Sequence, residues 1–324
     1  MLHRGGSAGV RYVNAYKYAL LPRLYGRVVI VRSGGSHAMP PQKYALVKDT
    51  TPITCTSPAD SWLKAAPRGA YTTARTVNRD AVFELDAHIK RLASSCQQML
   101  ENDAKAGGQH PSEELNKLSD AADLRPHVIA SLTAAVQAFR QDSPQHEGEL
   151  KLTVLISWES GQRLIQSHVA ALPDRPQPPV KVQARGAPRQ NATAKDSEWI
   201  LLVTEQGLVL EGTQTNFFAV VDDTVYTAEE GVLMGTVRGV VLEVCRREGI
   251  QVKLEAPSIH NVDKWQGAAI ASTSRLFLPV HMLEYQKESK PHERQFQYSK
   301  ETSLLRRLEQ LVLAEVEHRS ETLG

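Results

Sequence analysis

The sequence predicts an α+β fold in two domains, on the basis of three observations. A chain of 324 residues with 41% hydrophobic composition can bury a substantial core, and its length suits two domains or one large one. An early region mixes strand-like and helix-like periodicity, whereas a later region has the pattern of consecutive hairpins. Four prolines within residues 173–181 separate these regions. We therefore expect a small domain at 49–172, a linker at 173–180 and a larger domain at 181–324.

The small domain is predicted to contain a strand, two helices and two further strands. Its first strand is the stretch "GAYTTARTVN", in which apolar and polar residues alternate. The elements in order are a strand at 69–78, a helix within 79–100, a polar loop at 102–123, a helix at 124–140 and strands at 149–158 and 164–172. Apolar residues at helical spacing are Leu85, Ile89, Leu92, Cys96 and Met99 in the first helix, and Val128, Leu132, Val136 and Phe139 in the second. Pro126 is compatible with the second helix because we expect it in the first turn.

The larger domain is predicted to combine hairpins, a buried strand and two helices. The stretches "WILLVTEQGLVLEG" and "NFFAVVDDTVYT" have the pattern of strand pairs. The other elements are a helix at 236–249, a short buried strand at 268–273 and a C-terminal amphipathic helix at 303–316. The apolar faces are Val237, Val240, Val241, Val244 and Cys245 in the first helix, and Leu304, Leu308, Leu311 and Val312 in the second.

The first 48 residues have a composition of their own, with eight lysines and arginines and no acidic residue. An arginine-rich, acid-poor leader is typical of a mitochondrial or plastid transit peptide, and a disordered basic tail is the alternative. We therefore expect residues 1–48 to direct the protein to an organelle, with a cytoplasmic location as the alternative. The apolar stretch at 18–31 is interrupted by charge and is too short to span a bilayer.

Charge and cysteine content narrow the classes of ligand. A net charge of +2 without a dense basic run gives no support for nucleic acid, and no membrane anchor is evident, so we expect a small molecule. Cys55, Cys96 and Cys245 are odd in number and lack metal-ligand spacing. We expect three buried thiols in a reducing compartment, and no metal site.

Two charged residues flank the first hairpin of the larger domain. Lys195 lies in a polar loop before it, and Glu211 ends it beside Gly212. Taken alone, each is more typical of a solvated surface charge. A sheltered lysine, however, loses its proton more easily and can bond covalently to a carbonyl compound. A glycine beside the carboxylate permits the close approach of a ligand.

Two further places could bind a phosphate, and a third offers hydroxyl groups. Gly235 precedes a helix whose first N–H groups can donate to an anion. Thr273, with Ser272 and Ser274, follows a buried strand, where hydroxyls could equally cap the next turn. Arg91 lies beside the apolar face of the first helix, and it either extends to solvent or turns inward to hold a phosphate.

Read in chain order, six stretches resemble the class IV (fold-type IV) pyridoxal-phosphate enzymes. They are "GAYTTARTV", "FELDAHIKRL", "PRQNATAKDSEW", "LEGTQTNFFAV", "LMGTVRGVVLEV" and "ASTSRLFLPV". The resemblance covers residues 69–281 and is nearest to the branched-chain-aminotransferase-like proteins of plants and algae. This family contains branched-chain and D-amino-acid aminotransferases and 4-amino-4-deoxychorismate lyases. The resemblance implies a two-domain fold with pyridoxal 5'-phosphate at the domain interface, and usually a homodimer.

The resemblance also implies roles for individual residues. Lys195 in "NATAKDSEW" occupies the place of the lysine that binds the cofactor covalently, and Glu211 that of the glutamate paired with the pyridine nitrogen. Asn216 belongs to the adjoining "TNFF" signature. The residues expected at the phosphate are Arg91 in "HIKRL", Thr236 and Val237 in "LMGTVR" through main-chain N–H groups, and Thr273 in "STSR" through its hydroxyl.

One interval departs from the family, because the 16 residues between Lys195 and Glu211 are fewer than family members usually have. If residues 205–207 form the turn, Glu211 lies opposite Leu201, six residues from Lys195. An extended chain of that length spans about 20 Å, so both side chains can still reach one ring. Lys181 has a more family-like spacing, but its surroundings, "PPVKVQARG", are more typical of the strand before the lysine loop.

The expected activity is the transfer of an amino group between an amino acid, of branched-chain or D-amino-acid type, and a 2-oxo acid. The alternative within the family is a 4-amino-4-deoxychorismate lyase, which releases pyruvate and 4-aminobenzoate with the same cofactor residues. The alternative of another class is a catalytically impaired, cofactor-binding homologue, because of the short interval. Tyr71, Thr73 and Arg75 on the first strand are the candidates for substrate contact, or else ordinary solvent-facing residues.

Overall fold

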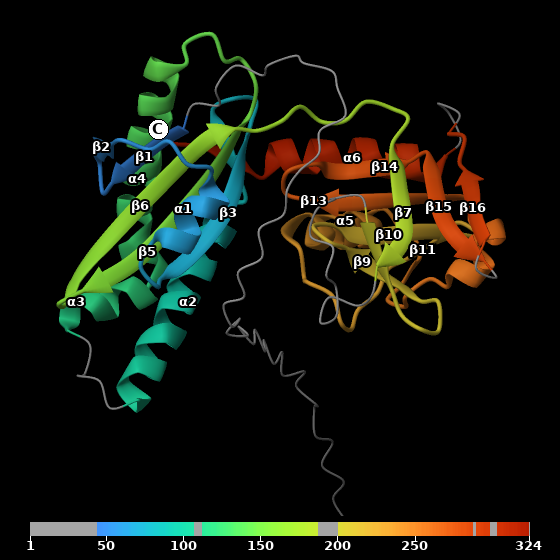
Figure 1. Ribbon diagram of the computed structural model, residues 1–324, viewed down its shortest axis with the longest axis horizontal. Coiled ribbons are helices and arrows are strands. Elements are labelled where there is room, and N and C mark those ends of the chain that lie inside the picture. The colour runs from blue at the N-terminus through green and yellow to red at the C-terminus, as the bar shows by residue number, and fades with distance from the viewer. Residues whose placement is uncertain (1–43, 107–111, 187–199, 288–289, 299–302, 324) are drawn as a thin grey trace, which may run out of the picture. The chain divides into compact units, whose positions relative to one another are not determined.

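The computed structural model in Figure 1 describes residues 44–106, 112–186, 200–287, 290–298 and 303–323. Within these ranges the chain forms a seven-stranded and a ten-stranded β-sheet, each accompanied by helices. The expected α+β fold class is therefore confirmed.

The first sheet has the strand order β17-β4-β3-β5-β6-β1-β2, and its strands pair in antiparallel fashion. Most of it comes from the first half of the chain, but its edge strand β17 is the C-terminal segment. The strands are β1 (Tyr44–Lys48), β2 (Thr51–Ile53), β3 (Ala70–Val77), β4 (Ala81–Phe83), β5 (Leu150–Glu159), β6 (Gln162–Ala171) and β17 (Ser320–Thr322).

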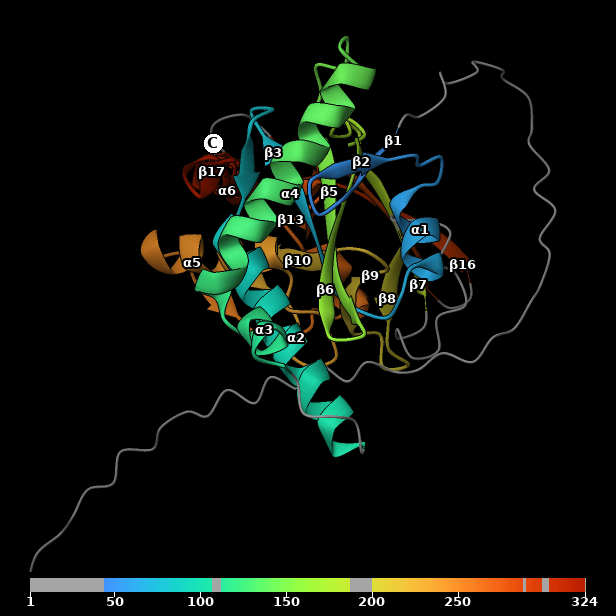
Figure 2. The same cartoon turned by 90° about the vertical axis from the view of Figure 1, so that its left-hand side faces the viewer.

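Helices cover both faces of the first sheet (Figure 2). α2 (Leu85–Lys105) and α4 (Ala121–Asp142) bury their apolar stripes against β3, β5 and β6 in one continuous core. Each fully buried leucine or valine side chain there contributes roughly 2 kcal/mol to folding. α1 (Ala59–Ala65) lies on the opposite face, where Trp62 stacks on His168 of β6 with ring centroids 5.4 Å apart.

The predicted polar loop at 102–123 is partly helical. α3 (Glu113–Asn116) and the 3-10 helix η1 (Lys117–Ser119) lie within it, and Asp120 caps α4 by accepting from the backbone N–H groups that follow. Because α4 begins at Ala121, Pro126 lies in its second turn. We had expected it in the first turn. We did not predict these short helices from the sequence, because their polar residues give no apolar periodicity.

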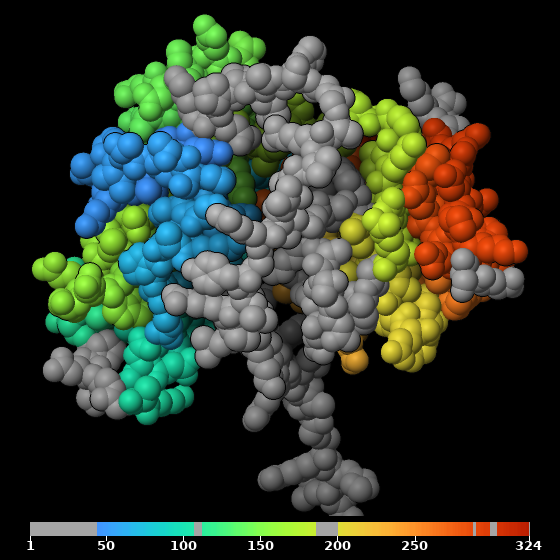
Figure 3. Space-filling view, in the orientation of Figure 1, coloured from blue at the N-terminus to red at the C-terminus, as the bar shows by residue number. Residues whose placement is uncertain are grey.

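The second sheet has the order β12-β11-β10-β9-β8-β7-β15-β16, with β13 joined to β10 and β14 to β13. Its edge strand β16 is exposed (Figure 3), and its lysine, proline and charged residues discourage pairing with another chain. The strands are β7 (Lys181–Gly186), β8 (Ile200–Val203), β9 (Val209–Gly212), β10 (Asn216–Val221), β11 (Thr224–Tyr226), β12 (Val252–Lys253), β13 (Gly267–Ser272), β14 (Leu276–Val280), β15 (Met282–Lys287) and β16 (Lys290–Gln295).

Two helices, α5 (Thr236–Arg247) and α6 (Leu304–His318), pack together against β13 and β14. The apolar face predicted for α5 is confirmed. The buried face of α6 is shifted from the prediction, because Leu304 and Leu311 are only partly buried. The fully buried apolar residues of α6 are Leu305, Leu308, Val312 and Val316.

Two expectations about the N-terminal region and the thiols need correction. β1 lies inside the expected leader and pairs with β6, so the boundary expected at residue 48 moves to before Tyr44. Residues 1–43 lie outside the described residues. The three cysteines are free, and Cys96 and Cys245 are buried, but Cys55 is only half-buried. Of the helices in the described ranges, none is both long enough and apolar enough to cross a membrane.

Candidate functional site

Three elements meet at a cavity of about 200 Å³. β9 contributes Glu211, the N-terminus of α5 contributes Thr236 and Val237, and the turn after β13 contributes Thr273. These residues are separated by up to 62 positions in the sequence (211 to 273). The fold therefore brings four of the residues expected around the cofactor to the wall of one cavity.

The hairpin of β8 and β9 sets the position of Glu211. Glu211 lies opposite Leu202, and the predicted partner Leu201 instead faces Gly212. The register shifts after Leu202, so β9 carries one extra residue in the manner of a β-bulge. The prediction was one residue off because it assumed a hairpin without a bulge. The path from Lys195 to the residue opposite Glu211 is then seven residues (202 minus 195), about 23 Å when extended.

The carboxylate of Glu211 is buried, with 2% of the residue exposed, and it helps to fix the segment that leads into α5. Its Oε2 accepts a hydrogen bond from the Leu233 N–H at 3.0 Å. Asn216, which faces Glu211 across β9 and β10, donates from Nδ2 to the Leu233 carbonyl at 2.7 Å. The backbone N–H and carbonyl of Leu233 are thus both held by the strand pair that carries Glu211.

Gly235 is the N-cap residue of α5, with φ of −65°. A Cβ atom there would lie 2.3 Å from Oδ1 of Asn216, so no larger residue fits without displacing that side chain. The first N–H groups of a helix have no intrahelical partner, and the helix dipole makes this end electropositive. Because Thr236 and Val237 line the cavity, this end of α5 is suited to an anion.

Two polar side chains near the cavity were not anticipated from the sequence. Arg238 is buried in the first turn of α5 and donates to the Ala228 carbonyl at 2.9 Å and to Sδ of Met234 at 3.2 Å. Burial lowers its pKa, and the charge of Glu229 opposes this. Thr215 lines the cavity, and its buried hydroxyl has no hydrogen-bond partner among the described residues. In the sequence, an arginine between the apolar positions of α5 could have identified Arg238. No pattern in the sequence singled out Thr215.

Arg91 reaches the site from α2. Its side chain is exposed, but Nη2 donates to Oγ1 of Thr236 at 3.1 Å, which places a cation at the N-terminus of α5. One turn earlier, His88 is buried and its Nδ1 lies 2.7 Å from Oγ1 of Thr72. Burial, followed by the charge of Arg91, lowers the pKa of His88 to about 4. His88 is therefore neutral at physiological pH.

The three substrate candidates on β3 do not line this cavity. Tyr71 is 48% exposed, and Thr73 is half-buried with its hydroxyl 3.4 Å from that of Thr153. Arg75 is buried and donates from Nη1 to the Ser274 carbonyl at 3.0 Å. Burial lowers the pKa of this guanidinium. Arg75 thus contacts the turn that carries Thr273, whereas only Tyr71 has the exposure of an ordinary surface residue.

The serines around Thr273 have the capping role that the sequence left open. Oγ of Ser272 accepts from the Arg275 N–H at 3.2 Å and lies 3.2 Å from Oγ of Ser274. These contacts shape the turn between β13 and β14. Thr273 is half-buried and lines the cavity.

Lys195 lies outside the described residues, so its position relative to Glu211 is not part of the site geometry. Lys181, the other lysine considered, is the exposed first residue of β7. β7 pairs in parallel with β8, which confirms that the stretch around Lys181 is a strand.

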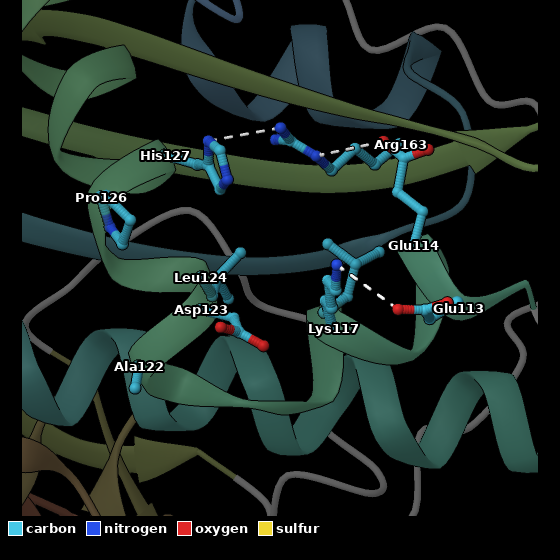
Figure 4. A pocket seen from close by; sticks show the side chains of 10 residues that line it. Glu113, Glu114, Lys117, Ala122, Asp123, Leu124, Pro126, His127 and Arg163 are labelled. Atoms are coloured by element: carbon cyan, nitrogen blue, oxygen red, sulfur yellow. Dashed lines mark hydrogen bonds and ion pairs between the residues drawn. The ribbon is translucent and has the colours of Figure 1, made fainter.

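A larger cavity, of about 710 Å³, lies between α3, η1, α4 and β6 (Figure 4). Its charged groups already contact one another: Arg163 is 3.7 Å from Glu114 and 3.3 Å from Nδ1 of His127, and Lys117 is 3.8 Å from Glu113. None of the residues expected around the cofactor lines it. Volume alone therefore does not identify the functional site. The His, Cys, Asp and Glu side chains in the described parts of the chain form no cluster that could hold a metal ion.

Comparison with known structures shows the same fold in several enzymes, all below 20% identity. A hypothetical aminotransferase from Mycobacterium tuberculosis in its PLP-bound form has 17% identity and a TM-score of 0.53 over 85% of this chain and 99% of that one. A fold IV-transaminase from Curtobacterium pusillum has 18% identity and a TM-score of 0.52 over 85% and 99%. The branched-chain aminotransferase of Thermoproteus uzoniensis with norvaline has 16% identity and a TM-score of 0.53 over 86% and 99%. A search of the curated proteins gave no significant match.

The sequence itself matches a protein family over most of the region that forms the two sheets. The pattern described as "Amino-transferase class IV" matches residues 69–283, which include β3, α2, the Glu211 hairpin, α5 and the turn with Thr273. This range contains every described residue that we placed around the cavity. The chain belongs to the class IV aminotransferase family, and its fold is that of the fold-type IV enzymes.

Proposed function

We propose that the protein transfers an amino group between an amino acid and a 2-oxo acid, with pyridoxal 5'-phosphate (PLP) as its cofactor. The observation that carries this proposal is the single cavity lined by Glu211, by the N-terminus of α5 and by Thr273. A buried carboxylate and a phosphate-binding helix end are the two groups that a pyridinium ring with a phosphate requires. Family membership and the PLP-bound form of a structural neighbour support the same cofactor.

The residues that line the cavity fit this cofactor. A Cβ atom at Gly235 would strike Asn216, so glycine keeps the backbone at the end of α5 accessible. The buried hydroxyl of Thr215 lacks a partner among the described residues, as expected for a group that meets a ligand. Glu211 places a buried carboxyl group in the wall of the same cavity.

Each residue then has a defined role. Glu211 holds a proton on the pyridine nitrogen. The N–H groups of Thr236 and Val237, with the hydroxyl of Thr273, bind the phosphate, and Arg91 adds a charged donor beside Thr236. When bound, PLP supplies the electron sink that stabilises negative charge at the substrate's α-carbon. With PLP bound, Lys195 would supply the amine that holds it and the group that moves the substrate's α-proton as general base and acid.

Two assays on the purified, PLP-loaded protein test this function. Amino-group transfer from branched-chain and D-amino acids to 2-oxoglutarate is expected, and Lys195→Ala abolishes it. Glu211→Gln slows the reaction because an amide holds the pyridinium proton less well than a carboxylate. Absence of transfer from every donor, with the cofactor bound, contradicts the proposal.

The lyase reaction is the second candidate, because the same cofactor residues would serve both reactions. Release of pyruvate and 4-aminobenzoate from 4-amino-4-deoxychorismate, without amino-group transfer, would assign the protein to this class. The short interval between Lys195 and Glu211 motivates the third candidate, a homologue that binds the cofactor and is catalytically impaired. A protein that takes up PLP and catalyses neither reaction would be this homologue.

The placement of the protein in the cell and in an assembly completes the proposal. The basic composition before Tyr44 supports import into a plastid or mitochondrion, with a cytoplasmic location as the alternative. Family resemblance supports a homodimer, a relation to the plant and algal branched-chain-aminotransferase-like proteins, and the division at 173–180 into a small and a larger domain. Fusion of residues 1–43 to a fluorescent protein tests the import, and light scattering tests the dimer.

A further inference from the structure

Arg319 joins three helices immediately after the end of α6. Its three guanidinium nitrogens each contact a different carboxylate: Nε contacts Glu315 at 2.7 Å, Nη1 contacts Glu84 at 3.0 Å and Nη2 contacts Glu243 at 2.7 Å. Glu315 belongs to α6, Glu243 belongs to α5, and Glu84 is the residue that precedes α2. One cation therefore connects the helix that carries Arg91 with the helix that begins at Thr236.

The backbone supports the same connection. Glu84 has φ of 53°, in the left-handed region that residues other than glycine rarely adopt. Its N–H donates to the Arg319 carbonyl at 3.0 Å, and Phe83 pairs with Ser320 between β4 and β17. The Phe83 side chain is buried in the apolar cluster of α5 and α6. Arg319 thus holds the start of α2 through both its main chain and its side chain.

The contact lies two helical turns from the proposed phosphate site on both helices. Arg91 follows Glu84 by seven residues (91 minus 84), and Glu243 follows Thr236 by seven (243 minus 236). At 1.5 Å per residue, both segments are about 10 Å long. The hydrogen bond from Arg91 to Thr236 joins α2 to α5 at one end, and Arg319 joins them at the other. The two segments therefore run antiparallel and are tied at both ends.

Arg319 is suited to this task because it stays charged. Burial is the largest effect and lowers its pKa, but its hydrogen bonds to Glu243, Glu315 and Glu84 together raise it. Without this cation, the carboxylates of Glu84 and Glu243 would lose their shared partner and repel each other. Arg247 would still pair with Glu315 at 2.5 Å. Among the described contacts, Arg247 reaches Glu248 and Glu315 but no residue of α2, so it offers no substitute.

We propose that Arg319 is a positioning residue for cofactor binding, which keeps the Arg91 guanidinium at the N-terminus of α5 by tying the start of α2 to α5. This inference rests on the proposed function, because it takes Arg91 and Thr236 as ligands of the PLP phosphate. Arg319 itself does not line the cavity and acts only through the placement of α2.

The test compares the affinities of the full-length apoprotein for PLP and for pyridoxal, which lacks the phosphate. Absorbance titration gives both dissociation constants, and their ratio measures the contribution of the phosphate. Arg319→Ala is expected to lower this preference about tenfold, the lower range for loss of one charge-assisted hydrogen bond. Glu243→Gln removes a carboxylate whose side chain is 46% exposed, and it should lower the preference for PLP less. This variant should still fold if Arg319→Ala does not. Arg319→Lys should recover only part of the preference for PLP, because one ammonium group cannot bind three separate carboxylates as a guanidinium does.

Arg247→Ala is the matched control, since it removes a guanidinium from Glu315 without touching α2. Its preference for PLP should equal that of the wild type. If Arg91→Ala loses the preference while Arg319→Ala and Glu243→Gln keep it, the role of Arg319 is overturned and the phosphate site stands. If Arg319→Ala weakens the binding of PLP and of pyridoxal equally, its effect is purely structural, and the proposed role of Arg319 is again overturned. A wild type that binds PLP no better than pyridoxal overturns the proposed phosphate site together with this inference.

Discussion

Replacing Gly235 by alanine should destabilise the protein, although its backbone angles suit any residue. With φ of −65°, the backbone adds no strain, and a glycine-to-alanine change at such a position ordinarily stabilises by about 0.4–1 kcal/mol. The new Cβ atom, however, would lie 2.3 Å from Oδ1 of Asn216, so that side chain must move by about 1.1 Å to reach an ordinary contact. Asn216 then loses its 2.7 Å hydrogen bond to the Leu233 carbonyl.

The cost can be estimated from these changes. Loss of this part-buried hydrogen bond costs about 0.5–1.5 kcal/mol, because the Leu233 carbonyl still accepts from the Gly235 N–H at 2.9 Å. Overpacking adds about 1–3 kcal/mol. After the alanine gain is subtracted, we expect Gly235→Ala to lower the free energy of unfolding by about 0.5–4 kcal/mol. PLP affinity should fall as well, because the displaced Asn216 side chain and the new methyl group at position 235 both lie in the lining of the cavity.

Urea unfolding followed by circular dichroism measures the effect, and Gly239→Ala in the same helix is the control. A Cβ atom at Gly239 meets nothing within 4 Å, so this variant should gain about 0.5–1 kcal/mol from helix propensity. In an Asn216→Ala background, the Gly235→Ala change should cost little, because the clashing atom is gone. Equal stability of the two glycine variants, or an undiminished cost in that background, would refute the reasoning.

Three further outcomes follow from the buried groups. The folded pKa of His88 is about 4, below the unfolded value near 6.5, so the free energy of unfolding falls by about 3 kcal/mol in total as pH drops through this window. In urea unfolding, His88→Gln should show a flatter dependence of stability on pH. An unchanged dependence contradicts this. Burial raises the pKa of Cys96 to about 12 and of Cys245 to about 11, so a thiol reagent at pH 8 should modify only Cys55 before unfolding and all three after it. Arg75→Lys should lose about 1–3 kcal/mol of unfolding free energy with the contact to the turn after β13, and unaltered urea unfolding would show that this contact is dispensable.

Local patterns predicted the elements that carry the site. The turn residues and alternation of the β8–β9 hairpin placed Glu211 at a strand end, and the apolar spacing of α5 placed Gly235 before a helix. These signals lie within about a dozen residues, so a sequence contains them directly. The bulge that shifts Glu211 from Leu201 to Leu202 has no such signal, because it depends on how β9 pairs with both neighbours.

Long-range contacts were beyond prediction from the residues alone. Arg319 meets Glu84 across 235 positions of sequence, and Arg91 meets Thr236 across 145. β17 and the short helices α3 and η1 are too short to show a period. The order of the motifs indicated that their residues belong together, and the cavity shows how Glu211, Thr236 and Thr273 meet.

Covalent trapping of the cofactor tests directly whether Lys195, Glu211 and the N-terminus of α5 form one PLP site. The full-length protein is loaded with PLP, reduced with borohydride, digested and mapped by mass spectrometry. We expect one modified peptide, containing Lys195, with its yield strongly reduced in Glu211→Gln and in Gly235→Ala. A label on Lys181, or a protein that takes up no cofactor at all, would contradict it.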